Sequence, residues 1–545
     1  MGPAVIRSKK MPTCGEALVK ILESYGVETV FGIPGVHTVE LYRGLPETTI
    51  RHITPRHEQG AGFMADGYAR ATGKPGVCLI ITGPGMTNIA TAMGQALADS
   101  IPMLVISSVN NTHQLGLGEG RLHELPNQRN LVSGVCVFSH TLLRADELPQ
   151  VIARAFTVFN SERPGPVHIE IPMDIITAQA GHIDMTPFAL PSAPAAAPNA
   201  VTAAVQLLKG ASRPLIALGG GSIGASKELA LLAEILSAPV VNTVNAKGVL
   251  PYSHALSVGG SGSCSAIREE FLAADVVLAI GTEFGETDYD FFFEGAVQFS
   301  GQLIRIDIDA RQLTRNVKAD LAIHSDAKLA VRAIVAALGE FRVTSADGET
   351  RAKALRQTLT EQRSPKYEAF FDAIRDVLPQ VIIAGDSTQP TYYAWLNYET
   401  EHARRYFHSA SGFGTLGYAI PAAIGAKLGN PSLPVIGLIG DGASQFTIGE
   451  LASAVEAQVP VIFLIWNNHG YGEIKRFMKD GDIPQIGVDI YTPDFCGLGK
   501  AFGCEVSRVT SLNELKLQLT IASQRQSPTV IEVVEADIVD GYPMA

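Results

Sequence analysis

Two turns in the last third of the sequence place oxygen ligands directly after apolar runs. Asp441 follows the apolar run 433–439, and Asn468 follows the run 459–465. Both runs are typical of buried strands, and residues 448–455 between them have helical spacing, which predicts a βαβ unit. Because the carboxyl ends of parallel strands meet at one edge of a sheet, we expect Asp441 and Asn468 to lie close together.

The residue types at these turns are those of a hard-cation site. Asp441 offers a carboxylate, Asn468 an amide oxygen and Gly470 a backbone carbonyl. These ligands are an incomplete shell for Mg²⁺ or Ca²⁺, and Mg²⁺ usually completes its shell with phosphate oxygens and water. A helix that starts just after Gly442 would add backbone donors for a phosphate. The pattern predicts a diphosphate held through a divalent metal.

A second candidate lies in the stretch 56–70, where Glu58 is followed by many small residues. Glycines inside a helix cost roughly 1 kcal/mol each, so their presence indicates close packing against another backbone, within the chain or across a subunit interface. A carboxylate buried at such a contact needs a partner or a raised pKa. The simpler alternative is that Glu58 is a helix-start charge favoured by the helix dipole.

Composition excludes several classes of protein. The chain has 545 residues with 46% hydrophobic and 18% charged residues, and its formal net charge of −12 argues against nucleic acid as a partner. No apolar stretch approaches the length of a membrane span, and residues 1–10 lack the apolar core of a signal peptide, so we expect a frayed tail there. The cysteines have no CxxC spacing, which favours reduced thiols and a cytoplasmic location: Cys14, Cys78, Cys136, Cys264, Cys496 and Cys504.

Strands and helices alternate along three blocks of the chain, which predicts an α/β protein with three doubly wound parallel-sheet domains. A proline-rich segment follows the first block and a polar stretch, 343–363, opens the third. We expect domains at 1–186, 187–342 and 343–545. Besides the two runs named above, the expected strands are 29–33, 76–81, 103–106, 166–171, 214–218, 276–280, 303–308 and 381–384.

Two motifs together resemble those of the thiamine diphosphate (ThDP)-dependent 2-oxo acid decarboxylase and carboligase family, in its acetolactate synthase-like branch. They are Gly-Asp-Gly at 440–442 with Asn-Asn at 467–468, and Arg-His-Glu with Gly-Tyr-Ala-Arg in 56–70. The resemblance implies pyrimidine-binding (PYR), central and diphosphate-binding (PP) domains in that order. Within the branch, about the first 135 residues are similar to 5-guanidino-2-oxopentanoate decarboxylases, notably at 31–46.

The resemblance also implies roles for individual residues. Glu58 would be the catalytic carboxyl that hydrogen-bonds N1′ of the cofactor's aminopyrimidine. The Gly414 carbonyl would meet the 4′-amino group, and Leu416 would be the apolar prop between the two rings. Asp441, Asn468 and Gly470 would hold Mg²⁺. The remaining candidate cofactor contacts are Ser387, Thr388, Gly442, Ala443, Ser444 and Asn88.

The substrate side of the site departs from other members of the branch. Val36 stands where pyruvate decarboxylases have Asp, and the adjacent His37 is a candidate proton relay that benzaldehyde lyase shares. His123, a second catalytic candidate, falls where acetolactate synthases have Gln. Ile474 and Phe477 fall where acetolactate synthases have Val and Trp in the substrate pocket. The charges at 473, 475 and 476 are either pocket-rim groups or a solvated helix face.

These residues lead to the hypothesis of ThDP- and Mg²⁺-dependent, non-oxidative decarboxylation of a 2-oxo acid. The alternatives are an acetolactate synthase or related carboligase and, from another class, a flavin- or nicotinamide-dependent oxidoreductase. The oxidoreductase would bind FAD or ADP in the central domain through residues 219–224, Gly-Gly-Gly-Ser-Ile-Gly, which fit the motif G-x-G-x-x-G. Asp307 and Asp309 would then lie near the ribose. A tight strand-to-helix turn is the simpler interpretation of these glycines. The resemblance further implies a homodimer or homotetramer with the active site at the subunit interface.

Overall fold

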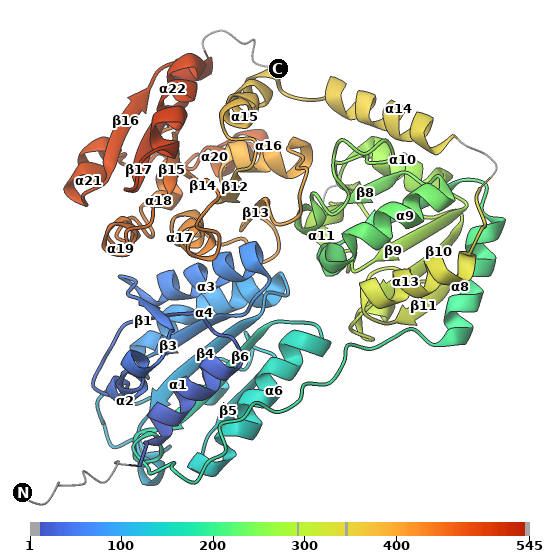
Figure 1. The fold of residues 1–545 in the computed structure, drawn as a ribbon. Helices are drawn as coiled ribbons and strands as arrows, with labels where there is room; N and C mark the ends of the chain where they lie inside the picture. The colour runs from blue at the N-terminus through green and yellow to red at the C-terminus, as the bar shows by residue number, and fades with distance from the viewer. Residues whose placement is uncertain (1–10, 291–293, 344–346, 540–545) are drawn as a thin grey trace, which may run out of the picture. The chain divides into compact units, whose positions relative to one another are not determined.

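The computed structural model describes residues 11–290, 294–343 and 347–539. The tail expected at residues 1–10 therefore lies outside the described residues. The chain divides into two compact units, of which the first is formed mainly by residues up to 191 and the second mainly by residues 192–545. Figure 1 shows the course of the chain, with blue to turquoise elements in the first unit and green to red elements in the second.

In the described residues, the first unit is built on a six-stranded parallel sheet with the order β2-β1-β3-β4-β6-β5. The strands are β1 Thr29–Gly32, β2 Arg51–Ile53, β3 Gly76–Ile80, β4 Met103–Val109, β5 Phe138–Thr141 and β6 Pro166–Pro172. The helices are α1 Cys14–Ser24, α2 Val39–Arg43, α3 Glu58–Thr72, α4 Pro84–Ala98, α5 Gln128–Leu131, α6 Leu148–Ser161 and α7 Met173–Ile176.

Local signals explain where these helices begin and how they pack. Thr13 caps α1 in a capping box, in which its hydroxyl accepts from the Glu16 amide at 3.2 Å and Glu16 accepts from the Thr13 amide at 2.6 Å. The apolar faces of α1 and α6 pack on the sheet in one core cluster. On α3, a Cβ at Gly62 would lie 2.4 Å from the Ala92 Cβ of α4. Glycine at 62 therefore allows α3 and α4 to pack closely within the chain.

The second unit holds two further parallel sheets among the described residues. The central sheet has the order β11-β10-β9-β7-β8. Its strands are β7 Pro214–Leu218, β8 Val240–Asn242, β9 Val276–Ile280, β10 Gln302–Asp307 and β11 Leu321–His324. Its helices are α8 Pro198–Gly210, α9 Ser226–Leu236, α10 Ser265–Ala273, α11 Glu286–Tyr289 and α13 Ala327–Leu338; the predicted polar stretch forms α14, Gly348–Glu361.

The last sheet has the order β13-β12-β14-β15-β17-β16, which repeats the order of the first sheet. Its strands are β12 Ile382–Gly385, β13 Tyr406–His408, β14 Val435–Gly440, β15 Ile462–Asn467, β16 Glu505–Val509 and β17 Thr529–Val534. Its helices are α15 Pro365–Val377, α16 Gln389–Asn397, α17 Ala419–Gly429, α18 Asp441–Ser444, α19 Glu450–Glu456, α20 Gly472–Asp480, α21 Phe495–Ala501, α22 Leu512–Ser523 and α23 Glu535–Val539.

The strand orders indicate where a ligand would bind in the first and in the last sheet. The chain runs from β12 outward to β13 and then returns to β14 on the other side, so the connections diverge between β12 and β14. In open parallel sheets, ligands bind at the carboxyl ends of the strands at such a point. In the first sheet, the same reasoning selects the carboxyl ends of β1 and β3. The predicted three-domain α/β fold is confirmed; the exact domain boundaries stay a prediction.

Candidate active site

The predicted metal ligands converge at the carboxyl ends of β14 and β15. These strands are paired in parallel, with Gly440 opposite Trp466, so Asp441 and Asn468 emerge side by side. The end of the Asn468 side chain lies 2.9 Å from the Gly470 carbonyl oxygen and 3.1 Å from Asp441 Oδ1. An octahedral Mg²⁺ with ligands at about 2.1 Å separates neighbouring oxygens by about 3 Å. The two separations from Asn468 therefore match those between neighbouring ligands of Mg²⁺.

Asp441 is almost completely buried, and this burial raises the pKa of its carboxyl. Backbone N–H groups, the first of them that of Gly442, and the Thr492 hydroxyl, 3.3 Å from Oδ2, act in the opposite direction. A cation beside the carboxylate would favour its ionised form further. Burial therefore disfavours the ionised form of Asp441, and a bound cation would stabilise that form.

The turn that carries Asp441 differs in one respect from the prediction. The helix expected to begin just after Gly442 is a single turn, α18, which begins at Asp441 and ends at Ser444. The Ser444 hydroxyl donates to the Asp441 carbonyl at 2.8 Å. A Cβ at Gly442 would lie 2.6 Å from the Tyr471 ring, so packing excludes a side chain there. Ala443 and Ser444 are buried in the same turn.

Asp386, at the end of β12, holds the loop predicted to support the cofactor rings. Its completely buried carboxylate accepts from the Ser387 amide at 2.9 Å, the Gly417 amide at 3.2 Å and the Ala419 amide at 2.9 Å. Burial raises its pKa to about 6 despite these donors. This carboxylate fixes the loop that presents Gly414 and Leu416.

The two loop residues differ in exposure. Gly414 has φ +72° and is exposed, with no atom within 4 Å of a Cβ added to it, and Leu416 is half-buried. The predicted phosphate contacts lie beside Asp386, where Thr388 is buried and Ser387 half-buried. The loop thus leaves Gly414 exposed and Leu416 partly exposed, which is compatible with the predicted support of the cofactor rings.

Glu58 begins α3 and is buried in the first unit. Asn88 of α4 donates to Glu58 Oε2 at 2.9 Å. A Cβ at Gly85 would lie 3.4 Å from Glu58 Oε1, so the glycine keeps that side of the carboxyl open. Asn88, which was predicted as a cofactor contact, therefore orients the catalytic candidate and leaves Oε1 available.

His37 and His123 lie together at the carboxyl ends of β1 and β3. Their ring centroids are 5.3 Å apart, and His123 Nδ1 lies 3.2 Å from the Thr82 carbonyl oxygen. This contact makes Nδ1 the protonated nitrogen of neutral His123 and leaves Nε2 as the acceptor. Burial, and secondly His123, lowers the pKa of His37, whose buried Nδ1 has no hydrogen-bond partner in the described part of the chain.

Gln128 was not among the predicted site residues, yet it joins this region to the interior of the sheet. Its Oε1 accepts from the Thr82 hydroxyl at 2.8 Å and the Gly83 amide at 3.0 Å. Its Nε2 donates to the Ser108 carbonyl at 3.0 Å and to Glu170 Oε2 at 3.1 Å. A buried amide with this many partners fixes the loop whose carbonyl orients His123. The sequence held no signal for it, because the partners come from distant segments.

Comparisons with known proteins agree with this geometry. Models of the thiamine pyrophosphate enzymes match the chain at residues 12–131 (N-terminal TPP binding domain), 201–334 (central domain) and 386–533 (C-terminal TPP binding domain). The chain is 44% identical over 538 residues to a probable 2-ketoarginine decarboxylase of Pseudomonas aeruginosa, covering 97% of this chain and 95% of that relative. The chain belongs to the thiamine pyrophosphate enzymes.

Other relatives of this thiamine pyrophosphate enzyme are acetolactate synthases. It is 31% identical over 561 residues to a probable acetolactate synthase large subunit of Methanocaldococcus jannaschii, covering 97% of this chain and 93% of the relative. It is 30% identical over 560 residues to the acetolactate synthase large subunit of Corynebacterium glutamicum, covering 98% and 88%. The predicted acetolactate synthase-like branch is therefore confirmed.

The predicted substrate-pocket residues of this enzyme are exposed in their own units. Val36 is 68% exposed beside the buried His37, and Ile474 and Phe477 are about half exposed on α20. The charges of α20 are paired on the surface: Arg476 with Glu473, and Lys475 with Asp489 at 2.5 Å. This pairing favours a solvated helix face over pocket-rim charges.

The central glycines of this thiamine pyrophosphate enzyme lie in a tight turn that packs closely on the next strand end. A Cβ at Gly219 would lie 2.2 Å from the Gly281 carbonyl oxygen, and one at Gly221 would lie 2.9 Å from the Gly281 Cα. Asp307 closes a local turn by accepting from the Asp309 amide at 2.8 Å. Gly219 and Gly221 thus face a neighbouring backbone, and neither this packing nor the family match supports FAD.

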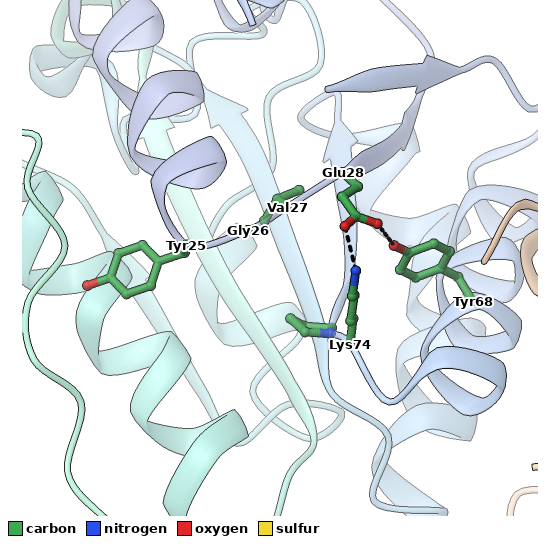
Figure 2. A pocket seen from close by; sticks show the side chains of 7 residues that line it. Tyr25, Gly26, Val27, Glu28, Tyr68 and Lys74 are labelled. Carbon is green, nitrogen blue, oxygen red and sulfur yellow. Dashed lines mark hydrogen bonds and ion pairs between the residues drawn. The ribbon is translucent and has the colours of Figure 1, made fainter. Parts of the chain in front are cut away.

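One pocket of the first unit lies away from the candidate site. It measures about 280 Å³ and is lined by residues 25–28, 68, 74 and 75, with the Glu28–Lys74 ion pair at 2.5 Å across it (Figure 2). These residues precede β1 and β3, so the pocket is at the amino ends of the strands, opposite the predicted chemistry.

In the ranges that the structure describes, the helices fall short of the length and apolarity that a membrane span needs.

Proposed function

We propose that this thiamine pyrophosphate enzyme decarboxylates a 2-oxo acid without oxidation, with thiamine diphosphate and Mg²⁺ as cofactors and 5-guanidino-2-oxopentanoate (2-ketoarginine) as the substrate class. The observation that carries the proposal is the 44% identity, over nearly the whole of both chains, to a relative named as a probable 2-ketoarginine decarboxylase. The three-oxygen arrangement of Asp441, Asn468 and Gly470 supports Mg²⁺.

Bound thiamine diphosphate supplies the carbon nucleophile and the electron sink that let CO₂ leave a 2-oxo acid. The protein's own part is positioning and proton control. Asp441, Asn468 and Gly470 would hold the cation that binds the diphosphate, while Ser387, Thr388 and the turn 442–444 would contact the phosphates. Gly414 and Leu416 would support the rings.

In the first unit, Glu58 would exchange a proton with the aminopyrimidine through Oε1, while Asn88 holds Oε2. His123 Nε2 would accept or return a proton at the reacting carbon, since Thr82 holds its Nδ1. His37 would assist as a neutral imidazole, because burial disfavours its charged form. Val36, Ile474 and Phe477 would face the substrate side chain.

A carboligase of the acetolactate synthase type is the second candidate, because relatives with that name are about 30% identical over nearly the whole chain. It would join the decarboxylated fragment to a second carbonyl instead of protonating it. The two candidates differ in product, so they are separated by product analysis.

The test is CO₂ release from 5-guanidino-2-oxopentanoate, pyruvate and benzoylformate with added thiamine diphosphate and Mg²⁺. The proposal expects the guanidino acid to have the highest kcat/KM and to give 4-guanidinobutanal. Acetolactate from pyruvate would favour the carboligase. Glu58→Gln should retain cofactor binding and lose about 10²- to 10⁴-fold in kcat, the usual contribution of an acid–base group. No CO₂ from any of the three acids would refute the proposal.

We further propose a cytoplasmic homodimer or homotetramer in which the Glu58 half of one subunit faces the Asp441 half of its partner. Mixing Glu58→Gln with Asp441→Asn subunits then restores intact sites, about a quarter of the total in randomly mixed dimers, although each variant alone is inactive. Absence of complementation, under conditions where subunits exchange, would contradict a shared site.

A further inference from the structure

A buried carboxylate, Glu532, is connected to the turn that carries Asn468 and Gly470, although it was not among the predicted site residues. Glu532 of β17 and Asn467 at the end of β15 are both almost completely buried. The two strands pair in parallel with Ile465 opposite Glu532, so the side chain of Asn467, two residues further along, lies on the same face of the sheet. The Asn467 Nδ2 donates to Glu532 Oε1 at 2.8 Å.

The other oxygen of Glu532 is held by Arg508, which lies opposite it on the neighbouring strand β16. Arg508 Nε donates to Glu532 Oε2 at 2.8 Å, and a second guanidinium nitrogen lies 2.8 Å from the same oxygen. A guanidinium only donates, so Glu532 acts as an acceptor toward Arg508 and offers Oε1 as an acceptor to Asn467. Each oxygen of this buried carboxylate therefore has a separate partner.

The other end of the Asn467 amide holds the turn itself. Its Oδ1 accepts from the His469 amide at 3.1 Å, which forms an Asx turn. His469 has φ +60° and Gly470 has φ +151°, so the turn uses two consecutive backbone conformations that are unfavourable for most residues. Just beyond them, the Tyr471 amide donates to the Val488 carbonyl at 2.9 Å. The contacts that hold this turn also hold the two predicted cation ligands that it carries.

The partners of Asn467 allow only one orientation of its amide. The His469 N–H is a donor and requires the amide oxygen, whereas Glu532 Oε1 is an acceptor and requires the amide nitrogen. Rotation of the amide by 180° would place donor against donor and acceptor against acceptor. Glu532 therefore selects the orientation in which the Asn467 oxygen faces the turn.

We propose that Glu532 is a positioning residue that acts through Asn467, so that it sets the affinity for Mg²⁺ without being a ligand. It keeps the Asn467 oxygen on the turn 468–470 and thereby keeps the turn in the conformation that presents the ligands. This inference rests on the proposed metal role of Asp441, Asn468 and Gly470. Groups that orient metal ligands in this way typically contribute about 10- to 100-fold to metal affinity.

The test measures Mg²⁺ binding to the full chain at saturating thiamine diphosphate and pH 8, by calorimetric titration after removal of bound metal. Asn467→Asp keeps an acceptor for the His469 amide but sets a carboxylate against Glu532, and it should weaken Mg²⁺ binding about 10- to 100-fold. The added negative charge alone would strengthen binding, so the sign of the change separates positioning from electrostatics. Relative to the wild type, the loss should shrink at pH 6, because a proton shared by the two carboxylates restores a donor.

The decisive variant combines Asn467→Asp with Glu532→Gln and has the same net charge as the wild type. Its amide nitrogen, now at position 532, can donate to the carboxylate at position 467, while its amide oxygen still accepts from Arg508. Mg²⁺ affinity should return to within about threefold of the wild type, which is a strong coupling between the two positions. Glu532→Gln alone should weaken binding, because one amide oxygen cannot serve both Asn467 and Arg508.

Thermal unfolding of each apo variant verifies that the fold is retained. Equal or tighter Mg²⁺ binding by Asn467→Asp at pH 8, or no recovery in the double variant, overturns the inference while the proposed function stands. Absence of Mg²⁺ binding to the wild type overturns the metal site itself, and the inference with it.

Discussion

Replacing Asp386 by Asn should change how the stability of the last domain depends on pH. Asp386 is completely buried, and burial raises its pKa from 3.8 to about 6. The folded protein therefore binds more protons than the unfolded chain between pH 3.8 and 6, so the contribution of Asp386 to stability is present below about pH 4 and is lost as the pH rises through 6. Asn does not titrate, so the variant lacks this loss.

The size of the effect follows from the shift. A pKa change of about two units corresponds to roughly 3 kcal/mol in total, since one unit is about 1.4 kcal/mol. Between pH 5 and pH 8, linkage predicts a loss of about 1.4 kcal/mol in the wild type. Besides this pH-dependent effect, Asn has only one acceptor oxygen, so the variant loses one hydrogen bond, such as the one from the Ala419 amide, which costs about 1 to 3 kcal/mol at every pH. The variant should therefore be least favourable, relative to the wild type, at low pH.

Tryptophan fluorescence during urea unfolding measures this directly, because the two tryptophans of the chain, Trp395 and Trp466, lie in the same domain as Asp386. The difference in unfolding free energy between wild type and variant should decrease by about 1.4 kcal/mol from pH 5 to pH 8. Groups common to both proteins cancel in this difference. A difference that stays flat, or grows with pH, would refute the assignment of a desolvated carboxylate.

Three further changes test separate contacts. Gly442→Ala should weaken the binding of thiamine diphosphate with Mg²⁺ and destabilise the domain by about 1 to 3 kcal/mol, because the new Cβ would lie 2.6 Å from the Tyr471 ring. Titration with the cofactor measures the affinity, and an unchanged affinity would contradict a packed cofactor turn. Lys247→Met should lower the unfolding free energy by about 3 to 5 kcal/mol, because it leaves the buried Glu399 without the lysine that it contacts at 2.6 Å. Adding Glu399→Gln should recover part of this loss. No recovery would mean that packing, and not charge, is responsible. Gln128→Leu removes the buried hydrogen bonds to Thr82 and Glu170, so it should lower both the melting temperature and kcat. The Mg²⁺ affinity of the Asp441 site should stay unchanged, because Gln128 belongs to the first unit. A selective loss of Mg²⁺ affinity would contradict this assignment.

The amino-acid sequence determined the fold class of this enzyme and predicted the residues that the structure brings together at the candidate site. Apolar runs fixed the strands, since period and length are local properties, and the ends of these runs carried Asp441, Asn468 and the loop before Glu58. In parallel sheets, residues that follow neighbouring strands meet at one edge, so the convergence of Asp441 and Asn468 could be predicted from spacing. The match to the thiamine pyrophosphate enzymes confirms the family and the fold class, while the ligand roles stay a prediction.

Only the tertiary structure decided which groups support those ligands. Asp386 binds the amides of residues 417 and 419, and Gln128 contacts Thr82 and Glu170, across separations that no local pattern encodes. The order of the strands brings these partners together: β12 lies beside β14, and β4 lies beside β6. The same holds for the central glycines: the sequence favoured a tight turn but left a nucleotide site open, and only the structure showed the Gly281 backbone against Gly219 and Gly221. Hydrogen bonds between side chains and distant backbone depend on strand order, and strand order is a property of the packed domain.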